Sequence, residues 1–367
     1  MTLSTSAQYG AAARMETAGA NGGVVMRAVR VVQHAAPLEA LELQDIPVPE
    51  PGPGEVLVKV GAASLNYGDI ARCRGTVASV MGQVPFTIGM DVCGVVESAG
   101  EGGEEWVGRR VVATTVQSFG GVADYALAGV TGVFEAPPEF DDVEAAAFTL
   151  PFHTGYLAVQ RRAKLQAGEE LLVIGGATAV GTAIIQLGNA AGAHVIASAD
   201  GAEKGELIRS LGAEPIDYTS EDLFDRVNAL TNDHGADVCT DMIGGEGTET
   251  VWTCMAREGR YVAVGFNDDP ESGLTGRPLR KVSMGNFSVL GVMMGYNDMP
   301  VEFRRFGLNT FPPSVGQEVH AALLELVSAG KIKPVIGRVV SMDEVAAALD
   351  DHANRRTSGR TVVDVTS

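Results

Sequence analysis

The segment LLVIGGATAVGTAIIQLGNAAGAHVIAS, from Leu171 to Ser198, decides the fold of the region around it. It has the pattern of an apolar strand, a glycine-containing loop, a helix and a second apolar strand. Dinucleotide-binding folds carry G-x-G-x-x-G at such a strand-to-helix turn. Here Gly176 and Gly181 occupy the first and third glycine positions, and Thr178 occupies the second. The segment therefore predicts a unit close to a dinucleotide cradle.

A threonine at the second position changes this cradle without excluding a phosphate. Glycine there lets the backbone approach a pyrophosphate, and the Cβ of Thr178 would crowd that approach. The helix N-terminus still supplies N–H donors and a favourable dipole, and the hydroxyl can donate one more hydrogen bond. Because glycine turns between a strand and a helix are common in α/β proteins, the surroundings of the loop must decide its role.

The strand after the loop favours NADPH over NADH. NAD-binding folds usually end this strand with an acidic residue that binds both ribose hydroxyls. Ala199 stands there instead, so Ser198 and Lys204 could bind a 2′-phosphate by hydrogen bond and charge. Asp200 works against this interpretation, and Lys204 could equally be a solvated lysine in the first turn of a helix.

The composition describes an acidic globular chain. It has 367 residues, of which 46% are hydrophobic and 20% charged, and this balance suits two domains with ample core. The net charge of −19 argues against nucleic acid and anionic membranes as partners. No apolar run approaches the roughly 20 residues that span a bilayer. We expect a small-molecule ligand.

Two features favour the cytoplasm. Residues 1–25 are small, polar and rich in glycine and alanine, and they lack the apolar region of a signal peptide. We expect them to form a flexible tail. The cysteines form no C-x-x-C pair and are expected to be small buried residues: Cys73, Cys93, Cys239 and Cys254.

Two kinds of pattern divide the chain. From Met26 to about Leu150, short valine-rich segments with Pro/Gly bends predict a small β-barrel. From Pro151 strands and helices alternate, which predicts a parallel sheet with helices on both faces. From Val301 the pattern returns to helices and a final strand, RTVVDV, expected to pack on the β unit. We predict an α/β fold in which residues 26–150 and 301–367 form the β domain and residues 151–300 the doubly wound domain.

From Met26 onward the chain resembles the medium-chain dehydrogenase/reductase superfamily, and within it the zinc-free quinone oxidoreductases that include zeta-crystallin. Several stretches carry the resemblance in the right order over roughly nine-tenths of the chain. They are PVPEPGPGEVLVKVGAASLNYGDIARCRG, IGMDVCGVVESAG, LPFHTGYLAV, the glycine loop, SADGAEKGELIRSLGAEPIDYTSED, DMIGG and REGRYVAVGF. The resemblance implies a GroES-like β-barrel catalytic domain, a Rossmann domain with NADPH in the cleft, and a homodimer.

The resemblance also implies a site without metal. Zinc enzymes of the superfamily bind the metal through a Cys, the histidine of G-H-E and a further Cys. Here Asn66 and Met90 stand at the first two positions. Zinc prefers thiolate and imidazole ligands, and neither replacement is a usual ligand. We therefore predict that the chain holds no metal.

The resemblance assigns residues to the site. Asn66 and Asp69 match the N-x-x-D motif of the family, and Asn66 and Tyr67 are candidates for the polar contact to the substrate. Asp69 could instead cap a helix, and Tyr218 could be a core aromatic at a strand end. The cofactor-binding residues implied are Thr154, Gly265, Phe266, Leu290, Gly291 and Val292 beside the nicotinamide, Gly176, Ala177, Thr178, Ala179, Val180 and Gly181 at the pyrophosphate, and Ser198, Lys204, Tyr218 and Arg355 at the 2′-phosphate.

One position departs from the family. Quinone reductases of the zeta-crystallin type carry a tyrosine two residues after the aspartate, where this chain has Ala71. On a helix Tyr67 would share a face with position 71, so it could replace that wall of the substrate pocket. Alternatively, Tyr67 packs in the core.

Together these patterns predict an NADPH-dependent reductase that transfers a hydride to a quinone or a similar conjugated electrophile. An NADPH-dependent enone or enoyl reductase is the alternative. A cofactor-binding protein with little turnover, acting as an interaction partner, would also suit the missing loop glycine and Ala71. The net charge of −19 disfavours RNA binding, which this branch can suggest.

Overall fold

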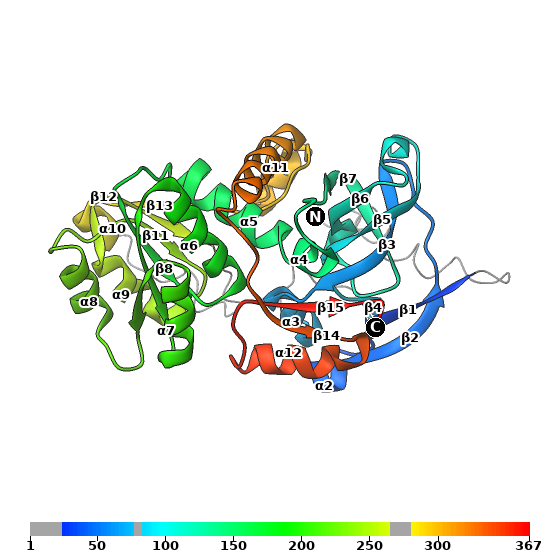
Figure 1. Ribbon diagram of the computed structural model, residues 1–367, viewed down its shortest axis with the longest axis horizontal. Helices are drawn as coiled ribbons and strands as arrows, with labels where there is room; N and C mark the ends of the chain where they lie inside the picture. Colours follow the sequence, from blue (N-terminus) through cyan, green and yellow to red (C-terminus); the bar gives the residue numbers. More distant parts are fainter. Residues whose placement is uncertain (1–23, 77–82, 265–279) are drawn as a thin grey trace. The chain divides into compact units, whose positions relative to one another are not determined.

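The computed structural model describes residues 24–76, 83–264 and 280–367. The chain divides into two compact units, one containing the residues up to Thr149 together with Ile336–Ser367, the other containing Leu150–Val335. The last strand of the chain, in red in Figure 1, pairs with a strand from the first part of the sequence. The first unit is therefore completed by the C-terminal end.

Mainly antiparallel strands build the first unit. One sheet has the order β2-β1-β4 and the other the order β14-β15-β3-β5-β6-β7, and an added pairing of β3 with β7 closes a four-stranded barrel. Valine-rich strands suit such a barrel because β-branched side chains pack well on a half-buried sheet. The strands are β1 (Val25–Val31), β2 (Leu41–Pro47), β3 (Glu55–Ser64), β4 (Phe86–Thr87), β5 (Asp91–Ala99), β6 (Arg110–Thr115), β7 (Tyr125–Glu135), β14 (Ile336–Val340) and β15 (Arg360–Asp364).

Short helices connect these strands. One of them, α3, follows β3 directly and ends at Gly75, whose φ of +64° favours glycine. The helices are α2 (Pro37–Ala40), α3 (Tyr67–Arg74), α4 (Asp142–Ala146) and α12 (Val345–Ala353), with 3₁₀ turns η2 (Glu104–Trp106), η3 (Val116–Ser118) and η7 (Met342–Glu344). The start of α3 carries the N-x-x-D motif.

The second unit contains a six-stranded sheet whose neighbouring strands are all parallel. Its order, β10-β9-β8-β11-β12-β13, reverses direction between β8 and β11. In doubly wound sheets of this order, ligands bind at the carboxyl ends of the strands around that reversal. The strands are β8 (Glu170–Ile174), β9 (His194–Ala199), β10 (Glu214–Asp217), β11 (Ala236–Asp241), β12 (Met255–Ala263) and β13 (Ser288–Gly291). The predicted α/β fold, with a barrel and a doubly wound sheet, is confirmed.

Helices alternate with these strands (Figure 1). They are α5 (Thr149–Tyr156), which continues as the π-helix η4 (Leu157–Arg162), then α6 (Ala179–Ala191), α7 (Gly201–Ser210), α8 (Leu223–Leu230), η5 (Gly245–Gly247), α9 (Thr248–Thr253), α10 (Arg280–Gly285), η6 (Val301–Phe306) and α11 (Pro313–Ser328). None of the described helices is both long and apolar enough to cross a membrane.

The second unit extends further along the chain than the sequence pattern predicted. It ends at Val335, whereas the predicted return to the barrel was at Val301. Tertiary contacts hold this segment: His320 of α11 lies 3.1 Å from the ring of His153, and Lys333 N donates to Gln186. Periodicity can show that residues 313–328 form a helix, but not the unit against which that helix packs.

Candidate functional site

The glycine loop joins β8 to α6 at the carboxyl edge of the parallel sheet. The turn itself falls at Gly175, one residue before the predicted start, where a φ of +83° favours glycine. A Cβ on Gly181 would lie 2.2 Å from the carbonyl oxygen of Gly175, so the helix can pack on the loop only with glycine there. In an α-helix the first N–H groups, here those of Ala179 and Val180, have no intrahelical acceptor. They form the kind of helix end that binds a phosphate.

Thr178 is the N-cap of α6. Its hydroxyl accepts a hydrogen bond from Gly181 N at 3.0 Å and donates one to the carbonyl of Gly175 at 2.8 Å. Because a hydroxyl carries one proton, no donor remains for the extra phosphate contact that the sequence suggested. Thr178 instead closes the loop onto the helix and so positions the N–H groups of the first turn.

The residues predicted at the 2′-phosphate in the second unit follow β9 and β10. Ser198 is buried, and its carbonyl accepts a hydrogen bond from Gly176 N at 2.8 Å. Tyr218 is 47% exposed and is therefore not the core aromatic that the sequence left open. Its N–H donates to Ala199 O at 3.3 Å. Adjacent strand ends thus bring these residues to one edge of the sheet.

Lys204, near the start of α7, is held by Asp200. Its ammonium lies 2.8 and 2.9 Å from the two carboxylate oxygens. Lys204 is therefore in an ion pair rather than simply solvated.

Arg355, the fourth residue assigned to the 2′-phosphate, belongs to the first unit. It follows α12 and has a φ of +59°.

On the other side of the strand reversal, β11 leads into a loop that sequence reasoning did not include in the site. The buried carboxylate of Asp241 accepts hydrogen bonds from Ile243 N and Gly244 N, both at 2.8 Å, and from the Tyr261 hydroxyl at 2.7 Å. Burial followed by the nearby Asp241 charge raises the pKa of Tyr261, which keeps this donor protonated. A Cβ on Gly175 would lie 3.1 Å from Ile243, so the two loops are in contact. The DMIGG stretch was the available signal.

The structure describes some of the residues that were predicted to lie beside the nicotinamide. Thr154 lies within α5, and Leu290 and Gly291 end β13, with Val292 following. Arg162 Nε donates to the carbonyl of Gly291 at 2.9 Å, which ties η4 to that strand end. Gly265 and Phe266 lie outside the described residues.

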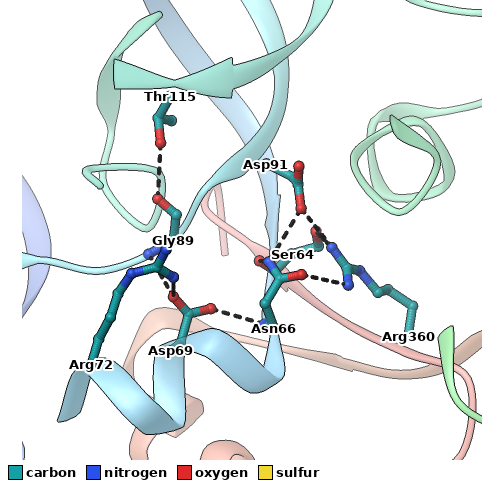
Figure 2. A network of polar contacts seen from close by, with 8 residues as sticks. All are labelled: Ser64, Asn66, Asp69, Arg72, Gly89, Asp91, Thr115 and Arg360. Atoms are coloured by element: carbon teal, nitrogen blue, oxygen red, sulfur yellow. Dashed lines mark hydrogen bonds and ion pairs between the residues drawn. The ribbon is translucent and has the colours of Figure 1, made fainter. Parts of the chain in front are cut away.

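In the first unit, Asn66 lies at the centre of a buried polar network (Figure 2). Its amide oxygen accepts from Arg360 Nη1 at 2.8 Å, and its amide nitrogen donates to Asp91 Oδ2 at 3.1 Å. Arg360 Nη2 also donates to Ser64 Oγ at 2.7 Å. Both polar atoms of the Asn66 side chain are therefore engaged within the protein.

Asp69 has the capping role that the sequence left open. Its fully buried carboxylate accepts from Asn66 N at 2.8 Å at the start of α3, and from Arg72 Nη1 at 3.0 Å (Figure 2). The N–H of Gly89 lies 3.4 Å from the same carboxylate. Asp69 thus joins the beginning of α3 to the turn before β5, a positioning role.

Sequence reasoning missed Arg360 and assigned no role to Asp91. Burial raises the pKa of the Asp91 carboxyl, while the Arg360 charge and the Asn66 hydrogen bond lower it. Asp91 directly follows Met90 in the GMDVCG stretch, which was the one available signal. Arg360 opens the final strand, and nothing local marked it.

Tyr67 and Ala71 do not share an environment. Tyr67 is 51% exposed and lies edge-on to the ring of His352, whereas Ala71 is 4% exposed. Tyr67 is the first residue of α3 and lies at the surface of this unit, so the alternative in which it packs in the core is wrong. Its replacement of the tyrosine missing at position 71 stays a prediction.

The described residues offer no cluster of three or more His, Cys, Asp or Glu side chains suited to a metal. Asn66, which the resemblance predicts at a zinc-ligand position, is hydrogen-bonded through both polar atoms, and the neighbouring Asp91 is paired with Arg360. An asparagine amide is not a usual zinc ligand, and both of these side chains already have partners within the protein, so the absence of zinc stays a prediction. The four cysteines are buried, as expected, and burial raises the pKa of Cys73 to about 12.

Comparisons with known proteins match both units. The family model described as "Alcohol dehydrogenase GroES-like domain" matches residues 52–138, and that described as "Zinc-binding dehydrogenase" matches residues 179–307. The quinone oxidoreductase of Lama guanicoe is 31% identical over 334 residues, which cover 90% of this chain and 95% of that protein.

Solved structures of oxidoreductases are also similar to this chain. A probable oxidoreductase from Mycobacterium abscessus is 31% identical, with a TM-score of 0.79, and the match covers 94% of this chain and 100% of that one. The quinone oxidoreductase of Thermus thermophilus, solved alone and in complex with NADPH, is 30% identical, with a TM-score of 0.73. That match covers 92% of this chain and 100% of that one.

Proposed function

The chain belongs to the quinone oxidoreductase branch of the medium-chain dehydrogenase/reductase superfamily, and we propose that it reduces quinones with NADPH and without zinc. It is an NAD(P)-dependent oxidoreductase. One observation carries the proposal: the glycine loop and the N-terminus of α6 lie at the strand reversal of a doubly wound sheet. This is where such folds bind the pyrophosphate of a dinucleotide.

The residues present fit NADPH. The N–H groups at the start of α6 would hold the pyrophosphate, and Lys204 and Tyr218, with Ser198, would hold the 2′-phosphate. No carboxylate stands at Ala199, the position that binds the ribose diol in NAD-binding folds. When bound, NADPH supplies a hydride from its nicotinamide ring.

In this reaction the residues of the protein would orient the substrate and provide a polar contact to its oxygen. Reduction of a quinone to a hydroquinone takes one hydride and one proton, and the proton can come from water or a side chain. Of the two side chains proposed for the polar contact to the substrate, Asn66 is engaged by Arg360 and Asp91. Tyr67, with its half-exposed ring, is the better candidate to stabilise negative charge on the substrate oxygen. Asn66 and Asp69 hold the start of α3 that carries it.

The test is NADPH consumption with a matched panel of quinones and α,β-unsaturated carbonyl compounds. We expect quinones to be reduced with the higher kcat/KM. Faster turnover of the unsaturated carbonyl compounds would favour the alkene reductase instead. Binding of NADPH without turnover of any acceptor would favour a cofactor-binding protein.

A further inference from the structure

The carboxylate of Asp200 has an unusual position at the start of α7. It is the N-cap residue of that helix, a place where aspartate commonly accepts from the helix N–H groups, yet it makes no such bond. Both of its oxygens lie on Lys204 Nζ instead, at 2.8 and 2.9 Å. The side chain of Asp200 is 38% exposed and that of Lys204 is 17% exposed, so the pair is partly shielded from solvent.

The start of α7 also contacts an acidic residue of the neighbouring strand. Asp217, at the end of β10, accepts from Gly201 N at 3.2 Å and from the N–H and hydroxyl of Thr219. These hydrogen bonds lower the pKa of Asp217 to about 2, so a second carboxylate is ionised beside the start of α7. The other cation of this helix, Arg209, pairs with Glu206 in its last turns.

A 2′-phosphate arriving here must take Lys204 from a carboxylate that already holds it. We propose that Asp200 sets the cofactor selectivity of the enzyme by competing with the 2′-phosphate of NADPH for Lys204, an inference that rests on the proposed function. NADPH binding exchanges one ion pair for another, whereas NADH binding leaves the Lys204–Asp200 pair intact. The native chain therefore discriminates between the two cofactors less strongly than its lysine would allow.

The test measures the Kd of NADPH and of NADH for the full chain by the change in its intrinsic fluorescence or by calorimetry. Asp200→Asn keeps the shape of the side chain and removes its charge. We expect NADPH to bind about tenfold more tightly, the scale of one charge-assisted hydrogen bond, and NADH to change by no more than about twofold.

Two further variants separate competition from general repulsion. In a Lys204→Met background, Asp200→Asn should give no gain in NADPH affinity, because the cation for which the two anions compete is gone. Glu203→Gln is the matched control, since Glu203 is an exposed carboxylate on the first turn of the same helix. It should leave the ratio of the two Kd values unchanged.

The outcomes are distinct. A tenfold gain that disappears without Lys204 supports the proposal. An unchanged NADPH Kd in a folded Asp200→Asn protein overturns it, as does a gain that persists in the Lys204→Met background or that Glu203→Gln reproduces. If the native chain binds neither cofactor, the proposed function itself fails. If it binds both and Asp200→Asn has no effect, only this inference fails.

Discussion

Arg360 Nη2 donates to Asp91 Oδ2 at 2.6 Å, in an ion pair whose side chains are only 5% and 1% exposed. The pair joins the C-terminal strand β15 to β5 in the barrel, and Asn66 bridges it (Figure 2). Since a buried charge without its partner is costly, this contact makes the C-terminal end of the chain part of the stability of the first unit.

Arg360→Met should lower the free energy of unfolding by about 3–5 kcal/mol, because it leaves Asp91 buried without its counter-charge. Arg356→Met is the matched control. Arg356 is 55% exposed and pairs with Asp350 and Asp351 at the surface, where solvent screens ion pairs, so its loss should cost far less than that of Arg360. Urea denaturation of both variants measures the difference, and equal small losses would contradict the structural role of the buried pair.

The stability of the second unit should fall below about pH 6.5 because of His153. Burial and then the neighbouring His320 hold the pKa of His153 well below its usual value of 6.5. The unfolded chain therefore takes up the proton first, and the native state loses up to about 1.4 kcal/mol of stability per pH unit below that value. The contribution is fully present above about pH 6.5 and falls as the pH decreases towards the lower folded pKa.

His153→Gln should flatten this dependence when the free energy of unfolding is measured from about pH 7.5 to 5.5. Each protein is compared with itself across pH, so a constant loss of stability from the substitution does not affect the result. Identical slopes for the native and His153→Gln proteins would show that this histidine does not control the acid sensitivity.

Thr178→Val should destabilise the protein in the absence of any cofactor, by about 1 kcal/mol, because it removes the N-cap of α6. Thr178→Ser keeps the hydroxyl and should retain most of that stability. Thermal unfolding of the cofactor-free proteins compares them. If the valine variant unfolds like the native protein but binds NADPH more weakly, the hydroxyl contacts the cofactor directly and the capping role is wrong.

Protein purified without a His-tag should contain far less than one zinc per chain, and chelators should leave its NADPH-dependent activity unchanged. The reason is chemical: the resemblance predicts Asn66 and Met90 at two zinc-ligand positions of the superfamily, and neither residue is a usual zinc ligand. Elemental analysis alongside activity assays checks both statements. Stoichiometric zinc that is lost together with activity would refute the metal-free proposal.

Much of the fold could be predicted from the sequence, because the spacing of apolar residues along a segment indicates which of its side chains are buried. Alternating apolar strands and helices over residues 170–263 indicated a parallel sheet, and valine-rich segments bounded by Pro and Gly indicated a barrel. The pattern around Gly176 and Gly181 located the strand-to-helix loop, since only short spacings and backbone conformation are needed there. The Lys204–Asp200 ion pair could also have been predicted from the sequence, because the two residues are four apart at the start of a helix.

By itself, the sequence determined the two kinds of domain and the position of the glycine loop, and through the resemblance it predicted that Asn66 and Met90 replace zinc ligands. Only the tertiary structure decided which unit contains α11, where the proton of Thr178 goes, and that Arg360 meets Asp91 across 269 residues and Asn66 across 294. The physical reason is that periodicity records whether a side chain is buried, but not its partner. That partner is chosen by packing between segments far apart in the chain, where a buried charge must find an opposite charge or a hydrogen bond.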